Sequence, residues 1–269
     1  MTLQQQERQE EWIGAATVTT SPLHGVRDGK GPWRTLLLVA LLTGLIYGAV
    51  VAITVSRYDN NVSALIVAGE QFVKQYPGSP GHHTVVYRHD SYDGLGYYYI
   101  AGNPFMRAPY IHDALRYQRI GYPFLVWAVS LGQRAWQPGA MIGVNIAAAM
   151  VIALLAGAII MWYAPGASVW WALACAVNPA LIIGVRDDLI EPVLTALALA
   201  GLLLYLRGGV AWAALVFAAA LLTREVGILF LAPLLAALSG AGLRSLTSRP
   251  PTLEELFLQH YGAGVGDRA

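Results

Sequence analysis

Charged residues are scarce in this chain of 269 residues: Asp, Glu, Lys and Arg make up 12% of it, against about 25% in a soluble domain. Cysteine is nearly absent, since Cys175 is the single one, and this excludes an intrachain disulfide and a cysteine-rich metal site. The net charge of +1 gives no reason to expect nucleic acid as a partner. Hydrophobic residues reach 56%, and the mean hydropathy is +0.50. Together these features favour a membrane protein.

Long apolar runs without charged residues account for the low charge content. Thr35 to Ser56 contains no charged residue, and its length exceeds the roughly 20 residues that cross a bilayer. It is too long for the apolar region of a signal peptide, and no small-residue cleavage site follows it. The predicted fold class is therefore all-α, a polytopic membrane helical bundle of about six spans. The further spans are predicted near 138–162, 168–185, 190–206, 209–222 and 226–243, with breaks or kinks at Pro179 and Pro192.

The distribution of basic residues predicts how the chain is oriented. Arg27, Lys30 and Arg34 precede the first span, and the positive-inside rule then places the N-terminus in the cytoplasm. We expect a multi-pass protein of the cell membrane with both termini cytoplasmic. Its predicted parts are an N-terminal tail at 1–34, a transmembrane module at 35–243 with an outer loop at 57–137, and a C-terminal tail at 244–269.

The side of the membrane on which each polar cluster lies depends on whether residues 120–133 span the bilayer. This apolar stretch is too short to span comfortably, which favours an interfacial helix. Arg207 then falls in the cytoplasm, while 186–188 and 224–225 lie on the outer side with Asp93. If 120–133 spans instead, those two clusters move to the cytoplasmic side. The first arrangement satisfies the positive-inside rule better and gathers the acids, so we prefer it.

The outer loop holds two acids beside a run of tyrosines. Asp90 and Asp93 are three residues apart and would share one face of a helix, although Gly94 and Gly96 allow a turn instead. Tyr97 and its neighbours suit the aromatic belt at headgroup level. A solvated loop anchored by interfacial tyrosines explains the spacing equally well. The loop histidines show no paired spacing on an evident helix, so no metal site is predicted from them.

Arginines and acids form three further clusters. Arg116 and Arg119 could bind a phosphate bidentately, or could contact lipid headgroups. The other two clusters interrupt apolar sequence, where ionisable groups are costly and usually face a cavity or a partner. Arg224 could neutralise one of the acids of the 186–191 segment across the bundle, and a short loop with a satisfied ion pair is the alternative. These two clusters are Arg186-Asp187-Asp188 followed by Glu191, and Arg224-Glu225.

The order of these motifs resembles that of the bacterial membrane glycosyltransferases of the C superfamily (GT-C). The resemblance covers roughly residues 35 to 243. It rests on Tyr92-Asp93-Gly94 and the following tyrosines, Arg116-Tyr117-Gln118-Arg119-Ile120-Gly121-Tyr122-Pro123, Asn145, Asn178-Pro179, Arg186-Asp187-Asp188 and Leu222-Thr223-Arg224-Glu225. It implies transfer of a sugar from a polyprenyl-phosphate donor on the extracytoplasmic side.

The resemblance also implies roles for particular residues. Asp93 corresponds to the essential acid of the first outer loop, with Asp90 as the second candidate, and 120–133 to a juxtamembrane helix. Leu95 stands where related sequences are expected to carry glutamine. A divalent cation is a candidate cofactor, and membrane lipids and a second membrane subunit are candidate partners. The candidate substrate- or phosphate-binding residues are Arg116, Arg119, Arg186, Asp187, Asp188, Arg224, Glu225 and Tyr97.

Two features depart from this superfamily. Its members usually have more spans, so the resemblance implies a truncated form. The stretch Arg244 to Gly262 resembles the C-terminal end of ABC-transporter ATPases, although the chain contains no phosphate-binding loop of the G-x-x-x-x-G-K-[ST] type. The alternative function is therefore a non-catalytic transmembrane subunit of an ABC-type transporter. A cavity that brings Asp93 near Arg224 and Asp187 would favour the enzyme.

Overall fold

A computed structural model describes residues 31–75, 83–89, 91–106 and 114–225. The predicted span at 226–243, the C-terminal tail and the N-terminal residues 1–30 lie outside the described residues. The described part is almost entirely helical, and its one sheet consists of two strands of two residues each. The all-α prediction is confirmed.

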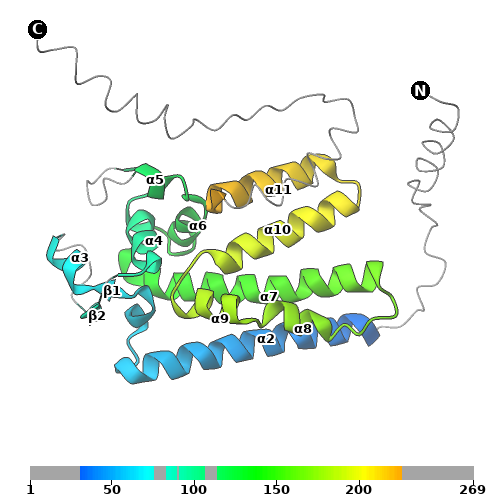
Figure 1. Cartoon of the computed structure of the whole chain (residues 1–269), viewed down its shortest axis with the longest axis horizontal. Coiled ribbons are helices and arrows are strands. Elements are labelled where there is room, and N and C mark those ends of the chain that lie inside the picture. Colours follow the sequence, from blue (N-terminus) through cyan, green and yellow to red (C-terminus); the bar gives the residue numbers. More distant parts are fainter. Residues whose placement is uncertain (1–30, 76–82, 90, 107–113, 226–269) are drawn as a thin grey trace, which may run out of the picture.

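Six helices form an antiparallel bundle, which we call the trunk. They are packed so that the chain runs back and forth along one axis (Figure 1). The C-terminal ends of α2, α9 and α11 therefore lie at the same end of the trunk as the N-terminal ends of α7 and α10. The trunk helices are α2 (Gly31–Val55), α7 (Gln137–Tyr163), α8 (Trp171–Ala176), α9 (Pro179–Arg186), α10 (Glu191–Leu206) and α11 (Val210–Thr223).

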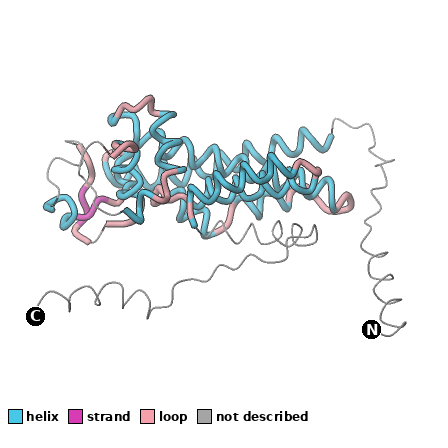
Figure 2. Tube along the Cα trace, turned by 90° about the horizontal axis from the view of Figure 1, so that it is seen from above, coloured by secondary structure: helices cyan, strands magenta, loops and turns pink. Residues whose placement is uncertain are grey.

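Short elements between α2 and α7 cover that same end. Figure 2 shows the two strands and the surrounding loops gathered beyond the ends of the trunk helices. The strands pair in parallel, with Ala68 opposite Val86. The elements in chain order are η1 (Ser56–Tyr58), η2 (Val62–Ile66), β1 (Ala68–Gly69), α3 (Glu70–Gln75), β2 (Val86–Tyr87), α4 (Asp93–Gly102), α5 (Ala114–Tyr117), α6 (Gly121–Val129) and η3 (Arg134–Trp136).

The predicted break at Pro179 is confirmed, but the segment 168–185 forms two short helices and not one kinked span. It is divided into α8 and α9 because Pro179 cannot continue a helix, and Asn178 instead caps the helix that follows. The Asn178 Oδ1 atom accepts a hydrogen bond from the Leu181 amide at 3.1 Å. The Tyr47 hydroxyl donates to the Ala176 carbonyl at 2.7 Å and ties α2 to the end of α8. Each half is too short to cross a bilayer.

Two helices of the described part are long and apolar enough to cross a membrane. They cover Trp33–Tyr58 and Arg134–Tyr163, which agrees with the first two predicted spans. The next two helices, α10 and α11, are apolar but shorter, with 16 and 14 residues. The count of six spans is therefore not confirmed. The short apolar stretch near 120–133 forms α6, whose nine residues are too few for a span.

Candidate functional site

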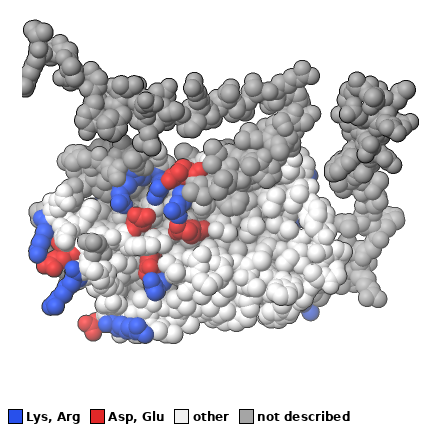
Figure 3. All heavy atoms as spheres, in the orientation of Figure 1, with Lys and Arg blue, Asp and Glu red and all other residues white. Residues whose placement is uncertain are grey.

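Charged side chains gather at one end of the molecule. In Figure 3 the blue and red atoms cluster over the end where α2 and α9 finish, while the trunk surface is almost uniformly uncharged. The short elements between α2 and α7 meet the α9–α10 junction there, so segments far apart in the sequence lie together. We call this region the polar end; its main residues are Arg57, Asp93, Tyr97, Arg116, Arg119, Arg186, Asp187, Asp188, Glu191, Arg224 and Glu225.

Asp93 begins α4 and lies directly beside the α9–α10 junction. A Cβ atom on Gly94 would be 2.5 Å from the backbone carbonyl oxygen of Asp187, a distance that real Cβ atoms do not adopt. Only glycine therefore allows the first turn of α4 to approach Asp187 this closely. The sequence pair Asp93-Gly94 thus places an acid against a segment almost a hundred residues later in the chain.

Arg116 lies over the same turn of α4. Its Nη1 atom is 3.4 Å from the Asp93 Oδ1 atom, and both side chains are about half exposed. A Cβ on Gly96 would be 2.6 Å from that same nitrogen, so the absence of a side chain at Gly96 leaves the space that the guanidinium occupies. An acid and a guanidinium are thus held together at a solvent-accessible position.

Arg119 forms a bidentate pair with Glu225. Its Nε and Nη2 atoms donate to the two carboxylate oxygens at 2.9 and 2.5 Å. Hydrogen bonding to Arg119 lowers the pKa of Glu225, and the same hydrogen bonds raise the pKa of Arg119. Tyr97 lies nearby in α4, where burial raises the pKa of its hydroxyl while the positive charge of Arg119 opposes that rise. Arg119 and Tyr97 therefore belong to one connected site.

Arg224 forms an ion pair with Glu191, so the expected neutralisation across the bundle is present. Glu191 begins α10 and Arg224 follows the last residue of α11, which explains why two residues 33 positions apart meet. The end of α11 also supports α6, since a Cβ on Gly121 would be 2.7 Å from the Thr223 hydroxyl oxygen. The pair therefore anchors α10 and α11 beside Arg119.

Arg186 forms a bidentate pair with its neighbour Asp187. The two hydrogen bonds measure 2.8 and 2.9 Å, and they raise the pKa of Arg186. The arginine is about half exposed, whereas the aspartate is largely covered. This guanidinium is therefore fixed in orientation and remains accessible on one side.

Asp188 is fully buried, unlike the other acids of the polar end. Its backbone is in the left-handed region, with φ of 48°, and its side chain has no exposed surface. Neither carboxylate oxygen has a hydrogen-bond partner among the described residues, and burial raises the pKa well above its ordinary value. Asn145 lies beside it; its Nδ2 atom donates to the Tyr122 hydroxyl at 3.1 Å, while its Oδ1 atom has no described partner. Asp188 is therefore too deeply buried to contact a bound phosphate.

A pocket of about 550 Å³ opens on the other side of the Arg186–Asp187 pair. We call it the Tyr87 pocket; besides that pair, its polar and aromatic lining comes from Arg57, Tyr58, Tyr87, His89 and Tyr92. Tyr58 and Tyr87 meet edge to face with ring centroids 5.5 Å apart, and Tyr87 and His89 are 5.0 Å apart. The sequence analysis missed this group. Its only signal was the arginine Arg57 directly after an uncharged span.

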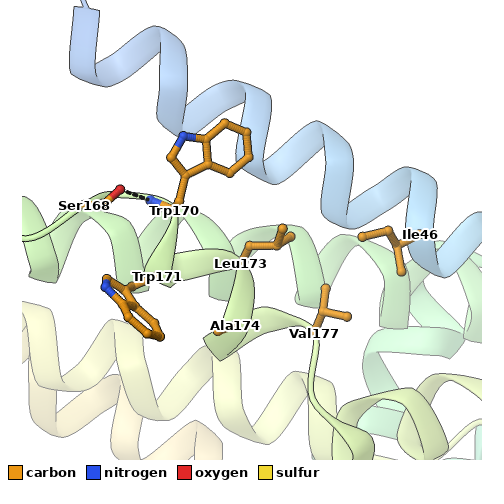
Figure 4. A pocket seen from close by; sticks show the side chains of 7 residues that line it. All are labelled: Ile46, Ser168, Trp170, Trp171, Leu173, Ala174 and Val177. Atoms are coloured by element: carbon orange, nitrogen blue, oxygen red, sulfur yellow. Dashed lines mark hydrogen bonds between the residues drawn. The ribbon is translucent and has the colours of Figure 1, made fainter.

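A second hollow, of about 590 Å³, lies on the trunk and has a different character. Figure 4 shows Ile46 of α2 facing Leu173 and Val177, with the rings of Trp170 and Trp171 near the other end of the hollow. Its lining is mostly apolar, and it contains no charged side chain. Cys175 is exposed on this part of the trunk.

Asp90 lies outside the described residues, so its position relative to Asp93 is not defined. Within the described ranges, no three side chains of His, Cys, Asp or Glu come together as a metal site. The described residues therefore provide no ligand set for the divalent cation that the resemblance suggests.

Comparisons with protein-family models, curated proteins and solved structures find no match to this chain.

Proposed function

We propose that this protein is a membrane glycosyltransferase that takes a sugar from a polyprenyl-phosphate donor at the polar end. The observation that carries the proposal is the meeting of Asp93, Arg116, Arg119 and the Arg186–Asp187 pair at the end of an apolar helix bundle. This arrangement suits a substrate with an apolar tail and a charged head.

Membrane insertion of the trunk is supported by what its surface exposes. Only 33% of the most apolar window of the first candidate span is buried within the protein, and 39% of the second. The core helix of a soluble protein would be mostly buried. Leu37, Leu41 and Leu45 of α2 are instead exposed, where lipid would cover them. In this proposal the polar end is extracytoplasmic.

Asp93 is the proposed general base. An acceptor hydroxyl loses its proton to the carboxylate as its oxygen forms a bond to the anomeric carbon of the sugar. The bond between that carbon and the phosphate oxygen breaks, and the electron pair leaves with the polyprenyl phosphate. Asp93 suits this role because it is accessible and is held at the start of α4 by the close contact of Gly94.

Arg116 and Arg119 are the proposed groups that stabilise the departing phosphate. Guanidinium groups bind phosphate oxygens bidentately and stabilise charge that develops as the bond breaks. Each of them is held by a carboxylate, Asp93 or Glu225, in the absence of substrate. A phosphate that exchanges with these carboxylates would meet donors that are already oriented. Exchange at Arg116 would also leave Asp93 available to the acceptor.

The test is sugar transfer from radiolabelled polyprenyl-phosphate donors in membranes that contain the protein. We expect Asp93→Asn to lower transfer by at least about 100-fold, because the amide cannot accept the proton. Arg119→Gln should lower it by about tenfold to 100-fold through loss of phosphate stabilisation.

Asp59→Asn is the matched control, since it removes the same charge at the same end. Asp59 has a φ of 53°, a conformation that asparagine also adopts readily, so this change should leave both folding and transfer intact. If wild-type membranes give no product above empty membranes with any common donor, the enzymatic proposal is wrong. If Asp93→Asn behaves like Asp59→Asn, the assignment of the base is wrong.

A further inference from the structure

We infer that the Tyr87 pocket is the acceptor site and that it binds a carbohydrate carrying an anionic group, a phosphate or a carboxylate. The acceptor role rests on the proposed function, whereas binding of the ligand does not. The charge, the shape and the position of the pocket support this inference.

The described charged residues that line the pocket are two arginines and one aspartate. Arg57 is exposed in the pocket and forms no ion pair or hydrogen bond with any residue of the described ranges. Arg186 is paired with Asp187, so two guanidinium groups face one carboxylate. Among the described lining residues, one guanidinium is therefore left without a carboxylate, and a guanidinium binds phosphate or carboxylate with well-defined geometry.

The walls of the pocket suit a sugar ring. The rings of Tyr58, Tyr87 and Tyr92 line the pocket, and the C–H faces of a pyranose can pack onto aromatic rings. The Tyr87 hydroxyl donates to the Ala64 carbonyl at 2.9 Å, which holds this ring in place before any ligand binds. The volume of about 550 Å³ is within the range of small-molecule sites and exceeds what a phosphate ion alone would need.

The pocket adjoins the proposed base. Tyr92 lines it and directly precedes Asp93, and its amide donates to the Val67 carbonyl at 3.3 Å, which fixes the start of α4 at the rim. Asp187 lines it too, and the carbonyl of Asp187 contacts Gly94. Arg116 and Arg119 contact α4 at Gly96 and Tyr97, which follow Asp93 in the helix. An acceptor in the pocket and a donor phosphate at these arginines would thus meet at Asp93.

The test measures binding to the purified full chain in nanodiscs by equilibrium dialysis. The probes are glucose 1-phosphate, glucose and inorganic phosphate, and a second arm places phosphatidylinositol in the nanodisc as a competitor. We expect saturable binding of glucose 1-phosphate, with weaker binding of the other two soluble probes. Competition by phosphatidylinositol would assign the natural ligand to a lipid headgroup, and its absence to a free sugar phosphate; both results support the shared chemistry.

Arg57→Gln should weaken binding of glucose 1-phosphate by at least about tenfold and change binding of glucose by less than about twofold. Arg88→Gln is the control, because Arg88 is exposed on the neighbouring segment and does not line the pocket. Equal effects of the two variants would overturn the inference. So would the absence of saturable binding, or binding of inorganic phosphate as tight as that of the sugar phosphate.

The transfer assay separates this inference from the proposed function. With a soluble acceptor, Arg57→Gln should raise KM for the acceptor with little change in kcat, whereas Asp93→Asn should lower kcat. If wild-type protein binds glucose 1-phosphate through Arg57 but transfers no sugar, the glycosyltransferase proposal and the acceptor role are wrong, and the binding site remains. If it transfers sugar without any effect of Arg57, the acceptor site is elsewhere.

Discussion

The trunk and the polar end of this protein differ in the side chains that they expose. On the trunk, large apolar side chains such as Leu41, Leu45 and Trp212 are exposed, and charge is almost absent. At the polar end, each of Arg119, Arg186 and Arg224 is paired with a carboxylate. The membrane proposal explains this difference by two surroundings, an apolar one along the helices and an aqueous one at the end with the paired charges.

The largest expected effect tests whether the trunk faces lipid. Leu45 is exposed near the middle of α2, and Leu45→Asp should disfavour membrane insertion by about 3 kcal/mol. Val86→Asp changes an exposed apolar residue of the polar end and should destabilise the protein by less than about 0.5 kcal/mol. The measurement is the fraction of each variant recovered in membranes after carbonate extraction. Equal recovery would mean that the two regions share one solvent, which would remove the basis of the membrane proposal.

A smaller effect should distinguish the close packing of the polar end from the open surface of the trunk. Gly94→Ala places a methyl group against the Asp187 carbonyl and should destabilise the protein by about 1–3 kcal/mol. Gly48→Ala meets no atom within 4 Å and should be neutral or stabilising by up to about 1 kcal/mol, because alanine favours a helix. The midpoint of thermal unfolding in detergent measures both. A lower midpoint for Gly48→Ala, or an unchanged one for Gly94→Ala, would contradict the described packing.

The smallest expected effect concerns the buried acid between the two regions. Burial raises the pKa of Asp188 in the folded state, so the folded protein holds this proton more tightly than the unfolded chain does. The stabilisation is complete below the ordinary pKa of an aspartate and is lost as the pH rises through the raised value. Asp188→Asn should therefore increase stability at pH 8 by on the order of 1 kcal/mol and should have little effect at pH 4.

The groups facing Asp188 allow this prediction to be checked closely. The charge of Asp187 raises its pKa further, and the Oδ1 atom of Asn145 could accept a hydrogen bond from the amide of the variant. Unfolding midpoints of wild type and Asp188→Asn should thus diverge with increasing pH. Midpoints that stay parallel from pH 4 to pH 8 would show that Asp188 does not titrate in this range.

Some features of the fold could be predicted because they depend on local sequence. The uncharged runs at 35–56 and 138–162 predicted the two long helices, since length and hydropathy suffice for that. Pro179 predicted the break before α9, yet 168–185 was still counted as one span. The count of six spans is not confirmed at this segment, because a hydropathy window does not distinguish one continuous helix from two short ones. The place of Asp188 inside the bundle was also missed, because it depends on a left-handed turn at a residue other than glycine.

The apolar runs, the two long helices and the presence of acids and arginines at the ends of apolar segments follow from the sequence, because periodicity and composition act over short distances. The partners of those charged groups do not. Arg119 meets Glu225 across 106 positions, and Asp93 lies against Asp187 because Gly94 has no side chain. Such contacts depend on how the helices pack and on which of their ends coincide. The packed structure therefore defines the site, and the sequence supplies the residues that form it.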